Sequence, residues 1–69
     1  MTIGERLLNL RKEKNISQEE LADILGVSRQ TISSLETGKY NPSIMLAYNI
    51  ANYFGMAIEE VFIFEEELV

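Results

Sequence analysis

Hydrogen-bonding side chains gather on one side of the segment RQTISSLE, residues 29–36. Successive residues of a helix lie about 100° apart, so Thr31, Ile32 and Leu35 fall together on one side. The polar groups that point the other way belong to Arg29, Gln30, Ser33 and Ser34. Arg can bond guanine and Gln adenine through two hydrogen bonds each, and Ser can bond several base edges. Taken alone, this polar side fits an ordinary solvated helix face better than a helix that reads bases in the major groove of DNA.

The residues that would position this segment are small or apolar and lie within residues 18–37. Ala22 is small where two steeply crossing helices come closest. Gly26 can adopt a positive φ and so close a tight turn without a Cβ penalty. Ile32 and Leu35, three residues apart on the second helix, anchor it against the first. The window therefore predicts two short helices joined by a turn.

The segment SQEELADILGVSRQTISSLETGKYNPS, residues 17–43, resembles the DNA-binding domains of phage repressors and Cro proteins and of their small XRE-type relatives. The resemblance implies an all-α fold of the lambda-repressor type, a compact five-helix bundle with a central helix-turn-helix. It also implies a sequence-specific transcriptional regulator of double-stranded DNA, a repressor, with residues 29–36 in the major groove. Together with the predicted turn, the resemblance favours base reading over a solvated face, so Arg29, Gln30, Ser33 and Ser34 are predicted to read bases. Such regulators usually bind as dimers, so a homodimer on a pseudo-palindromic operator is expected.

Capping signals predict where the first three helices begin. Residues 2–5 (T-x-x-E) and 17–20 (S-x-x-E) each have the spacing of a capping box. The first helix is expected to end near Asn15. Ser28 is predicted to cap the third helix, which stops at Gly38.

The second half of the chain is predicted to hold two more helices. The fourth follows the Pro-containing loop at residues 39–43 and ends at Gly55. A short fifth helix is expected around residues 58–62. The closing residues, 62–69, fit either a short edge strand or a frayed, extended end.

Phosphate contacts are predicted by position. Gln18 lies at the start of the second helix, where free backbone N–H groups and the helix dipole favour an anion. In the family that the chain resembles, the Gln at this position binds a backbone phosphate, which implies the same role here. Lys39, a cation beside the reading helix, gains affinity by counterion release. The remaining predicted phosphate contacts are Ser28, Thr37, Tyr40 and Asn41, for which capping of a helix (Ser28, Asn41) and packing of a ring (Tyr40) are the structural alternatives.

Arg11 and Glu36 are predicted to have a structural role. Both lie at the boundary of an apolar stripe, on the first and third helices. Members of the family often pair an Arg and a Glu at these positions, which implies a partly buried, two-bond ion pair between the two helices. The alternative is that Arg11 binds phosphate.

Composition narrows the function further. The chain has 69 residues, 46% of them hydrophobic, which suits one domain over residues 1–69. It contains neither Cys nor His, so no metal site, cofactor or catalytic centre is expected, and the protein is predicted not to be an enzyme. No small-molecule ligand is evident. The first 15 residues lack the apolar core of a signal peptide, and no apolar run approaches membrane-spanning length, so a cytoplasmic protein without a membrane partner is expected.

The net charge of −5 is unusual for a nucleic-acid binder. Residues 1–44 carry six basic and six acidic side chains and are therefore neutral overall. Residues 45–69 carry five acidic side chains and no basic one, which accounts for the whole net charge. Because positive charge cannot supply the affinity for DNA, contacts to bases, contacts to DNA shape and dimerisation must supply much of it.

The end of the chain is richer in apolar residues than one short helix can bury. Residues 58–69 are therefore predicted to form a two-fold dimer interface, the alternative being that they close the core of the monomer. The predicted interface residues are Ile58, Val61, Phe62, Ile63, Phe64 and Leu68. The same feature keeps a second function class open, a protein-interaction module such as an antitoxin or an antagonist of another regulator.

Overall fold

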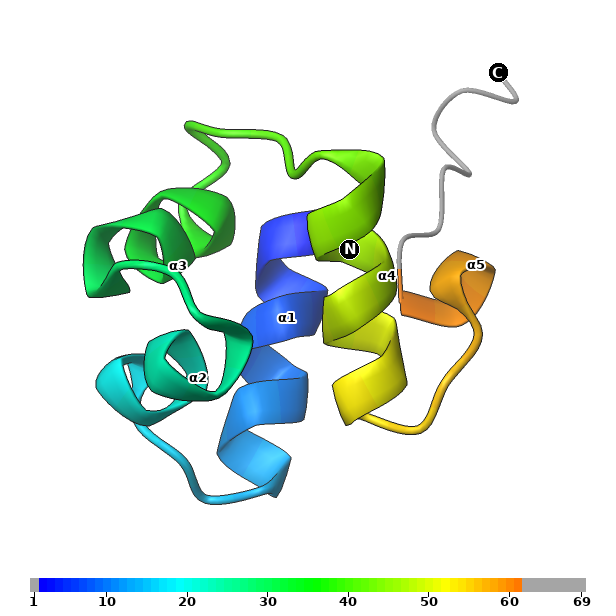
Figure 1. Ribbon diagram of the computed structural model, residues 1–69, viewed down its shortest axis with the longest axis horizontal. Coiled ribbons are helices and arrows are strands. Elements are labelled where there is room, and N and C mark those ends of the chain that lie inside the picture. The colour runs from blue at the N-terminus through cyan, green and yellow to red at the C-terminus, as the bar shows by residue number, and fades with distance from the viewer. Residues whose placement is uncertain (1, 62–69) are drawn as a thin grey trace.

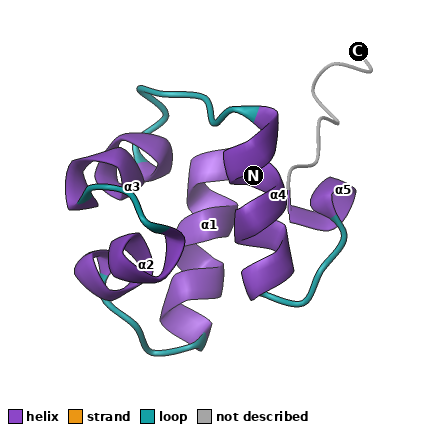
Figure 2. Cartoon of the chain, viewed as in Figure 1, coloured by secondary structure: helices purple, strands orange, loops and turns teal. Residues whose placement is uncertain are grey.

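The computed structural model describes residues 2–61 of the chain. Within these residues the regular secondary structure is all helical: α1 (Ile3–Glu13), α2 (Gln18–Leu25), α3 (Arg29–Glu36), α4 (Ile44–Tyr53) and α5 (Ile58–Val61). Figure 1 shows α2 and α3 beside each other, α1 and α4 at the centre and α5 next to α4. Loops join the helices throughout (Figure 2). The predicted all-α architecture with five helices is confirmed; the strand or extended end predicted for residues 62–69 lies outside the described residues.

A hydroxyl side chain caps the N-terminus of each of the first four helices. In the predicted capping boxes, the Thr2 hydroxyl accepts from the N–H of Glu5 at 3.1 Å and the Ser17 hydroxyl from that of Glu20 at 3.0 Å. Each Glu side chain accepts in return from the capping residue's N–H, at 2.8 Å. Such a cap typically stabilises a helix by about 1 kcal/mol. A serine hydroxyl alone caps the other two helices, Ser28 on α3 and Ser43 on α4.

Left-handed glycines end the second and third helices where the sequence predicts. Gly26 has φ 74°, closes the turn between α2 and α3, and donates its N–H back to the carbonyl of Ala22. Gly38, with φ 80°, follows α3. The fourth helix ends at Tyr53, slightly before the predicted stop, and Gly55 with φ 68° lies in the turn beyond it.

Every helix contributes a fully buried aliphatic side chain larger than alanine to a single core. Each of these side chains is at most 1% exposed. Burying an aliphatic side chain of this size stabilises the fold by roughly 1.5–3 kcal/mol. The five, in order from α1 to α5, are Leu7, Leu21, Ile32, Ile50 and Val61.

Gly4 sets how closely α1 approaches the end of α3. A Cβ at this position would lie 2.4 Å from the carbonyl oxygen of Glu36 and 2.7 Å from that of Leu35. Both atoms are backbone and cannot move aside as a flexible side chain could. The sequence offers no signal for this contact, because the glycine lies inside a capping box far from α3 in the chain.

The short helix α5 is held against α1 and the core. The Nε of Arg6 donates to the backbone carbonyl of Glu60 at 2.7 Å. Val61 is 0% exposed and Ile58 packs partly buried against the same core. For Val61 the structure therefore shows the alternative to the predicted dimer interface, a side chain that closes the core of the monomer. The other predicted interface residues beyond it, Phe62, Ile63, Phe64 and Leu68, lie outside the described residues.

Candidate nucleic-acid interface

The outward side of α3 carries the four residues predicted to read bases. Arg29 and Gln30, in its first turn, are exposed, whereas Ser33 and Ser34 are partly buried. On the opposite side, Ile32 is 0% and Leu35 2% exposed. Two deeply buried anchors therefore fix the rotation of the helix, and its polar side faces away from the core.

Ser28 acts first of all as the cap of α3. Its hydroxyl accepts from the N–H of Thr31 at 3.1 Å and lies 3.0 Å from the Thr31 hydroxyl, with which it shares a hydrogen bond. The side chain is exposed, so its oxygen can still be approached from solvent. The structural role predicted as the alternative for Ser28 is present in the structure.

A shallow hollow of about 340 Å³ lies on the outward side of α3. It brings Tyr40, from the loop after the helix, to the same surface as the predicted base-reading side chains. Tyr40 is 43% exposed, so it is not packed into the core. The residues that line the hollow are Ser28, Gln30, Thr31, Ser34 and Tyr40. Thr31, which the helical period placed with Ile32 and Leu35, is only partly buried and lies at the edge of the outward side.

The loop that follows α3 exposes the remaining predicted phosphate contacts. Thr37 donates from its hydroxyl to the carbonyl of Ser34 at 3.3 Å, and the backbone N–H of Lys39 donates to the same carbonyl at 2.9 Å. The side chains of Lys39 and Asn41 are exposed. Asn41 does not cap α4, because Ser43 does. The backbone of this loop is thus tied to the reading helix while its side chains stay accessible.

Arg11 and Glu36 form a two-bond ion pair between α1 and the end of α3. The Arg11 Nε lies 2.7 Å from Glu36 Oε2, and Nη2 lies 3.2 Å from Oε1. A third bond runs from Arg11 Nη1 to the carbonyl of Ile16 at 2.9 Å. The two side chains are 12% and 5% exposed. The pair therefore joins α1 to the last turn of α3 and fixes α3 against the rest of the domain.

Gln18 is joined to this pair. Its Nε2 donates to Glu36 Oε1 at 2.9 Å. A side-chain amide has two donor hydrogens and an acceptor oxygen, so one N–H engaged in this way leaves further bonding capacity. The sequence gives no signal for this bond, because 18 residues separate the two side chains.

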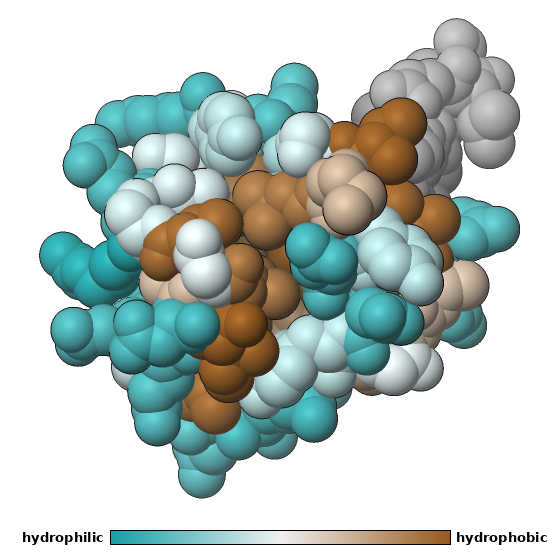
Figure 3. Space-filling model, in the orientation of Figure 1, coloured by the Kyte–Doolittle hydropathy of each residue, from teal (hydrophilic) through white to brown (hydrophobic). Residues whose placement is uncertain are grey.

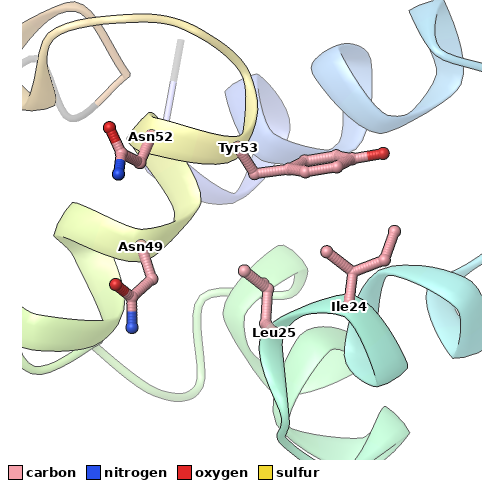
Figure 4. A pocket seen from close by; sticks show the side chains of 5 residues that line it. All are labelled: Ile24, Leu25, Asn49, Asn52 and Tyr53. Carbon is pink, nitrogen blue, oxygen red and sulfur yellow. The ribbon is translucent and has the colours of Figure 1, made fainter.

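A second hollow, of about 320 Å³, lies between α2 and α4 and shares no lining residue with the first. Figure 4 shows Ile24 and Leu25 projecting from α2 towards the ring of Tyr53, with Asn49 and Asn52 on α4. No group of three or more acidic side chains within residues 2–61 is placed to hold a metal ion. None of the helices described is long and apolar enough to cross a membrane.

Comparison with known proteins agrees with the arrangement of α2 and α3. A family model described as helix-turn-helix matches residues 7–61. The chain belongs to the helix-turn-helix family of DNA-binding transcriptional regulators. The family resemblance predicted from residues 17–43 is thereby confirmed.

Several known proteins are similar to this chain over most of the chain's length. An HTH-type transcriptional regulator of Methanocaldococcus jannaschii is 52% identical over 62 residues, 90% of this chain and 94% of the relative. One of Archaeoglobus fulgidus is 55% identical over 90% of this chain and 87% of the relative. The immunity repressor protein of Bacillus phage phi105 is 33% identical over the whole chain, which spans 47% of that repressor.

Solved structures support the same fold. The restriction-modification controller protein C.AhdI from Aeromonas hydrophila superposes with a TM-score of 0.79 at 33% identity, covering 87% of each chain. The P22 c2 repressor in complex with a synthetic operator superposes with a TM-score of 0.86 at 24% identity, over 91% of this chain and 96% of the repressor. At 24% identity, the likeness to the P22 c2 repressor supports the fold alone. The lambda-repressor-like bundle predicted for this helix-turn-helix protein is confirmed.

Proposed function

We propose that this chain is a sequence-specific repressor that binds double-stranded DNA with α3 in the major groove. The observation that carries the proposal is the division of α3 into two sides, one buried through Ile32 and Leu35 and one polar and facing away from the core. The Arg11–Glu36 pair holds the far end of the helix. A helix whose rotation is fixed in this way presents the same side chains to each operator, as direct base readout requires.

The exposed first turn of α3 supplies the main base contacts. Arg29 and Gln30 can each make two hydrogen bonds to one base, to guanine and adenine respectively. Ser33 and Ser34 have short side chains and are partly buried, so they reach base edges only where the helix lies deep in the groove. Discrimination therefore rests mainly on the two long side chains, and the serines add close contacts.

Phosphate contacts flank this reading turn on both sides. Gln18, at the start of α2, binds a backbone phosphate with the amide group that Glu36 orients. Lys39 provides a cation in the loop after α3. The exposed side chains of the same region complete the set: Ser28, Thr37, Tyr40 and Asn41.

The protein acts as a homodimer on a pseudo-palindromic operator, in the cytoplasm, without catalytic activity and without a cofactor. The small size of the domain supports this assembly, because one α3 helix contacts few base pairs and two copies double the readout. The net charge of −5 supports it further, since non-specific attraction to DNA is weak and a second half-site adds affinity.

Selection of duplexes from a random library tests this function. The expected result is enrichment of an inverted repeat whose half-sites are centred about 10–10.5 base pairs apart or a multiple of that distance. A titration of the selected duplex is expected to show log K falling as log salt rises. If no sequence is enriched and no duplex is bound at low salt, the chain acts as a protein-interaction module instead.

A further inference from the structure

The hollow on the outward side of α3 offers more than hydrogen-bonding groups. None of the five described residues that line it is charged, and Arg29, the cation of the reading turn, is not among them. Two of the five carry apolar groups: Thr31, in the first turn of α3, has a methyl group, and Tyr40, in the loop after α3, has an aromatic ring. Figure 3 shows pale surface of intermediate hydropathy, with strongly hydrophilic surface beside it, over the part of the molecule where Figure 1 draws α3.

The side chain of Thr31 is held in one orientation. Its hydroxyl lies 3.0 Å from the hydroxyl of Ser28, and its backbone N–H donates to the same Ser28 oxygen at 3.1 Å. A threonine in a helix ordinarily divides between two rotamers, and this hydrogen bond favours the one that turns the hydroxyl towards the cap. Because the substituents of Cβ are staggered, fixing the hydroxyl also fixes the methyl group. Thr31 therefore lines the hollow with a side chain whose methyl group has a defined position.

The position of Tyr40 is set by the loop that carries it. The carbonyl of Ser34 accepts from the backbone N–H of Lys39 at 2.9 Å and from the Thr37 hydroxyl at 3.3 Å, so the loop turns back onto α3 directly before Tyr40. Tyr40 is 43% exposed, which leaves much of its side chain accessible to a ligand. A tyrosine has an apolar ring and a polar hydroxyl. Its ring can therefore contact a base while its hydroxyl bonds a phosphate.

We propose that Thr31 and Tyr40 bind the 5-methyl group of one thymine in each half-site. The inference rests on the proposed function, because it names a base that the same interface reads. Thymine is the base whose major-groove edge carries an apolar group, and the methyl group of threonine is one of the side-chain groups that contact it. The major-groove edges of the other three bases present hydrogen-bond donors and acceptors, which a methyl group and a ring cannot recognise.

Gln30 places this thymine near an adenine. It lines the same hollow, and its side chain can make two hydrogen bonds to adenine. Side chains that share one hollow contact the same base pair or neighbouring ones. The thymine therefore belongs to the A·T pair that Gln30 reads or to the pair beside it. An apolar contact of this kind adds affinity without positive charge, which suits a chain with a net charge of −5.

Deoxyuridine tests the contact, because it pairs with adenine as thymidine does and lacks only the 5-methyl group. Each thymine of the selected half-site is replaced in turn, and the affinity of the parent chain is measured by fluorescence anisotropy. Replacement of one particular thymine is expected to weaken binding about threefold to tenfold, the effect of removing one methyl group from an apolar contact. Thr31→Ser keeps the hydroxyl and loses the methyl group, so it should bind the two duplexes equally. Tyr40→Ala should reduce the same preference.

Two further substitutions separate the methyl group of Thr31 from a general effect on the protein. Thr37→Ser deletes the same methyl group at an exposed position that does not line the hollow, and it should keep the parent's preference for thymine. Thr31→Val loses the hydroxyl and keeps a methyl group. It should therefore keep the preference as well, although its bond to Ser28 is lost.

The outcomes distinguish this inference from the proposed function. If no replacement by deoxyuridine weakens binding of the parent, or if Thr31→Ser keeps the parent's preference, Thr31 and Tyr40 do not bind a thymine methyl group. The parent then still binds its selected operator, and the proposed function stands. A parent chain that binds no duplex at low salt would overturn the proposed function, and the thymine contact with it.

Discussion

Gln18, in the first turn of α2, donates a hydrogen bond of 2.9 Å to Glu36, in the last turn of α3. The same carboxylate receives two bonds from Arg11 on α1. One acidic side chain therefore connects three helices, and it links the predicted phosphate contact to the fixation of the reading helix. The two roles can be separated by substitution, because stability and DNA affinity are measured independently.

Glu36→Gln is expected to lower the free energy of unfolding by about 3 kcal/mol, because a largely buried Arg11 then loses its charged partner. Thermal or urea denaturation followed by circular dichroism measures this change. Glu13→Gln, at an exposed position of the same charge on α1, is the control and should change stability little. Equal small losses for both variants would show that the ion pair does not fix α3.

Gln18→Ala is expected to behave differently. It removes one hydrogen bond to a carboxylate that keeps its Arg11 bonds, so the fold should lose only about 1 kcal/mol. DNA affinity should fall for every duplex tested, because a phosphate contact carries no sequence information. Fluorescence anisotropy on the selected site and on a scrambled duplex checks this. A loss confined to the selected site would contradict the assignment.

Gly4→Ala is expected to destabilise the domain by about 1–3 kcal/mol, the usual cost of overpacking a close contact. The added Cβ would lie 2.4 Å from a backbone oxygen of Glu36, so α1 and α3 must separate. Alanine favours helices intrinsically, which makes any destabilisation diagnostic of the contact. Lys12→Ala, exposed on the same helix, controls for helix propensity. Unchanged or increased stability of the Gly4 variant would show that the helices do not meet here.

Lys39→Ala is expected to weaken binding to all duplexes by a similar factor. It should also reduce the slope of log K against log salt by about 0.9, the contribution of one neutralised phosphate. Titration at several salt concentrations measures the slope. Lys12→Ala, a cation exposed on α1, should leave it nearly unchanged. A loss that depends on one base pair would instead place Lys39 among the base contacts.

The parts of the fold that local chemistry determines could be predicted from the sequence. Capping residues Thr2, Ser17 and Ser28 gave the helix starts, and the spacing of Ile32 and Leu35 gave the buried side of α3. A helical period and a capping box act within a few residues, so they can be read without the tertiary structure.

Contacts between distant residues could not be predicted in the same way. The bonds from Gln18 to Glu36 and from Arg6 to Glu60 span 18 and 54 residues, and nothing in the local pattern specifies either. The burial of Val61 could not be predicted either, because an apolar residue near the end of a chain suits a core or an interface equally well. Only the packing of α5 against α1 and α4 decides between them.

The central claim, that the outward side of α3 reads bases, is tested most directly by Gln30→Ala. Affinities of the parent and the variant are compared on the selected operator and on operators changed at each base pair of a half-site. The parent should discriminate one adenine position by about 1–3 kcal/mol, and the variant should lose that discrimination while keeping the others. If the variant discriminates every position as the parent does, Gln30 does not read a base and the assignment of this face is contradicted.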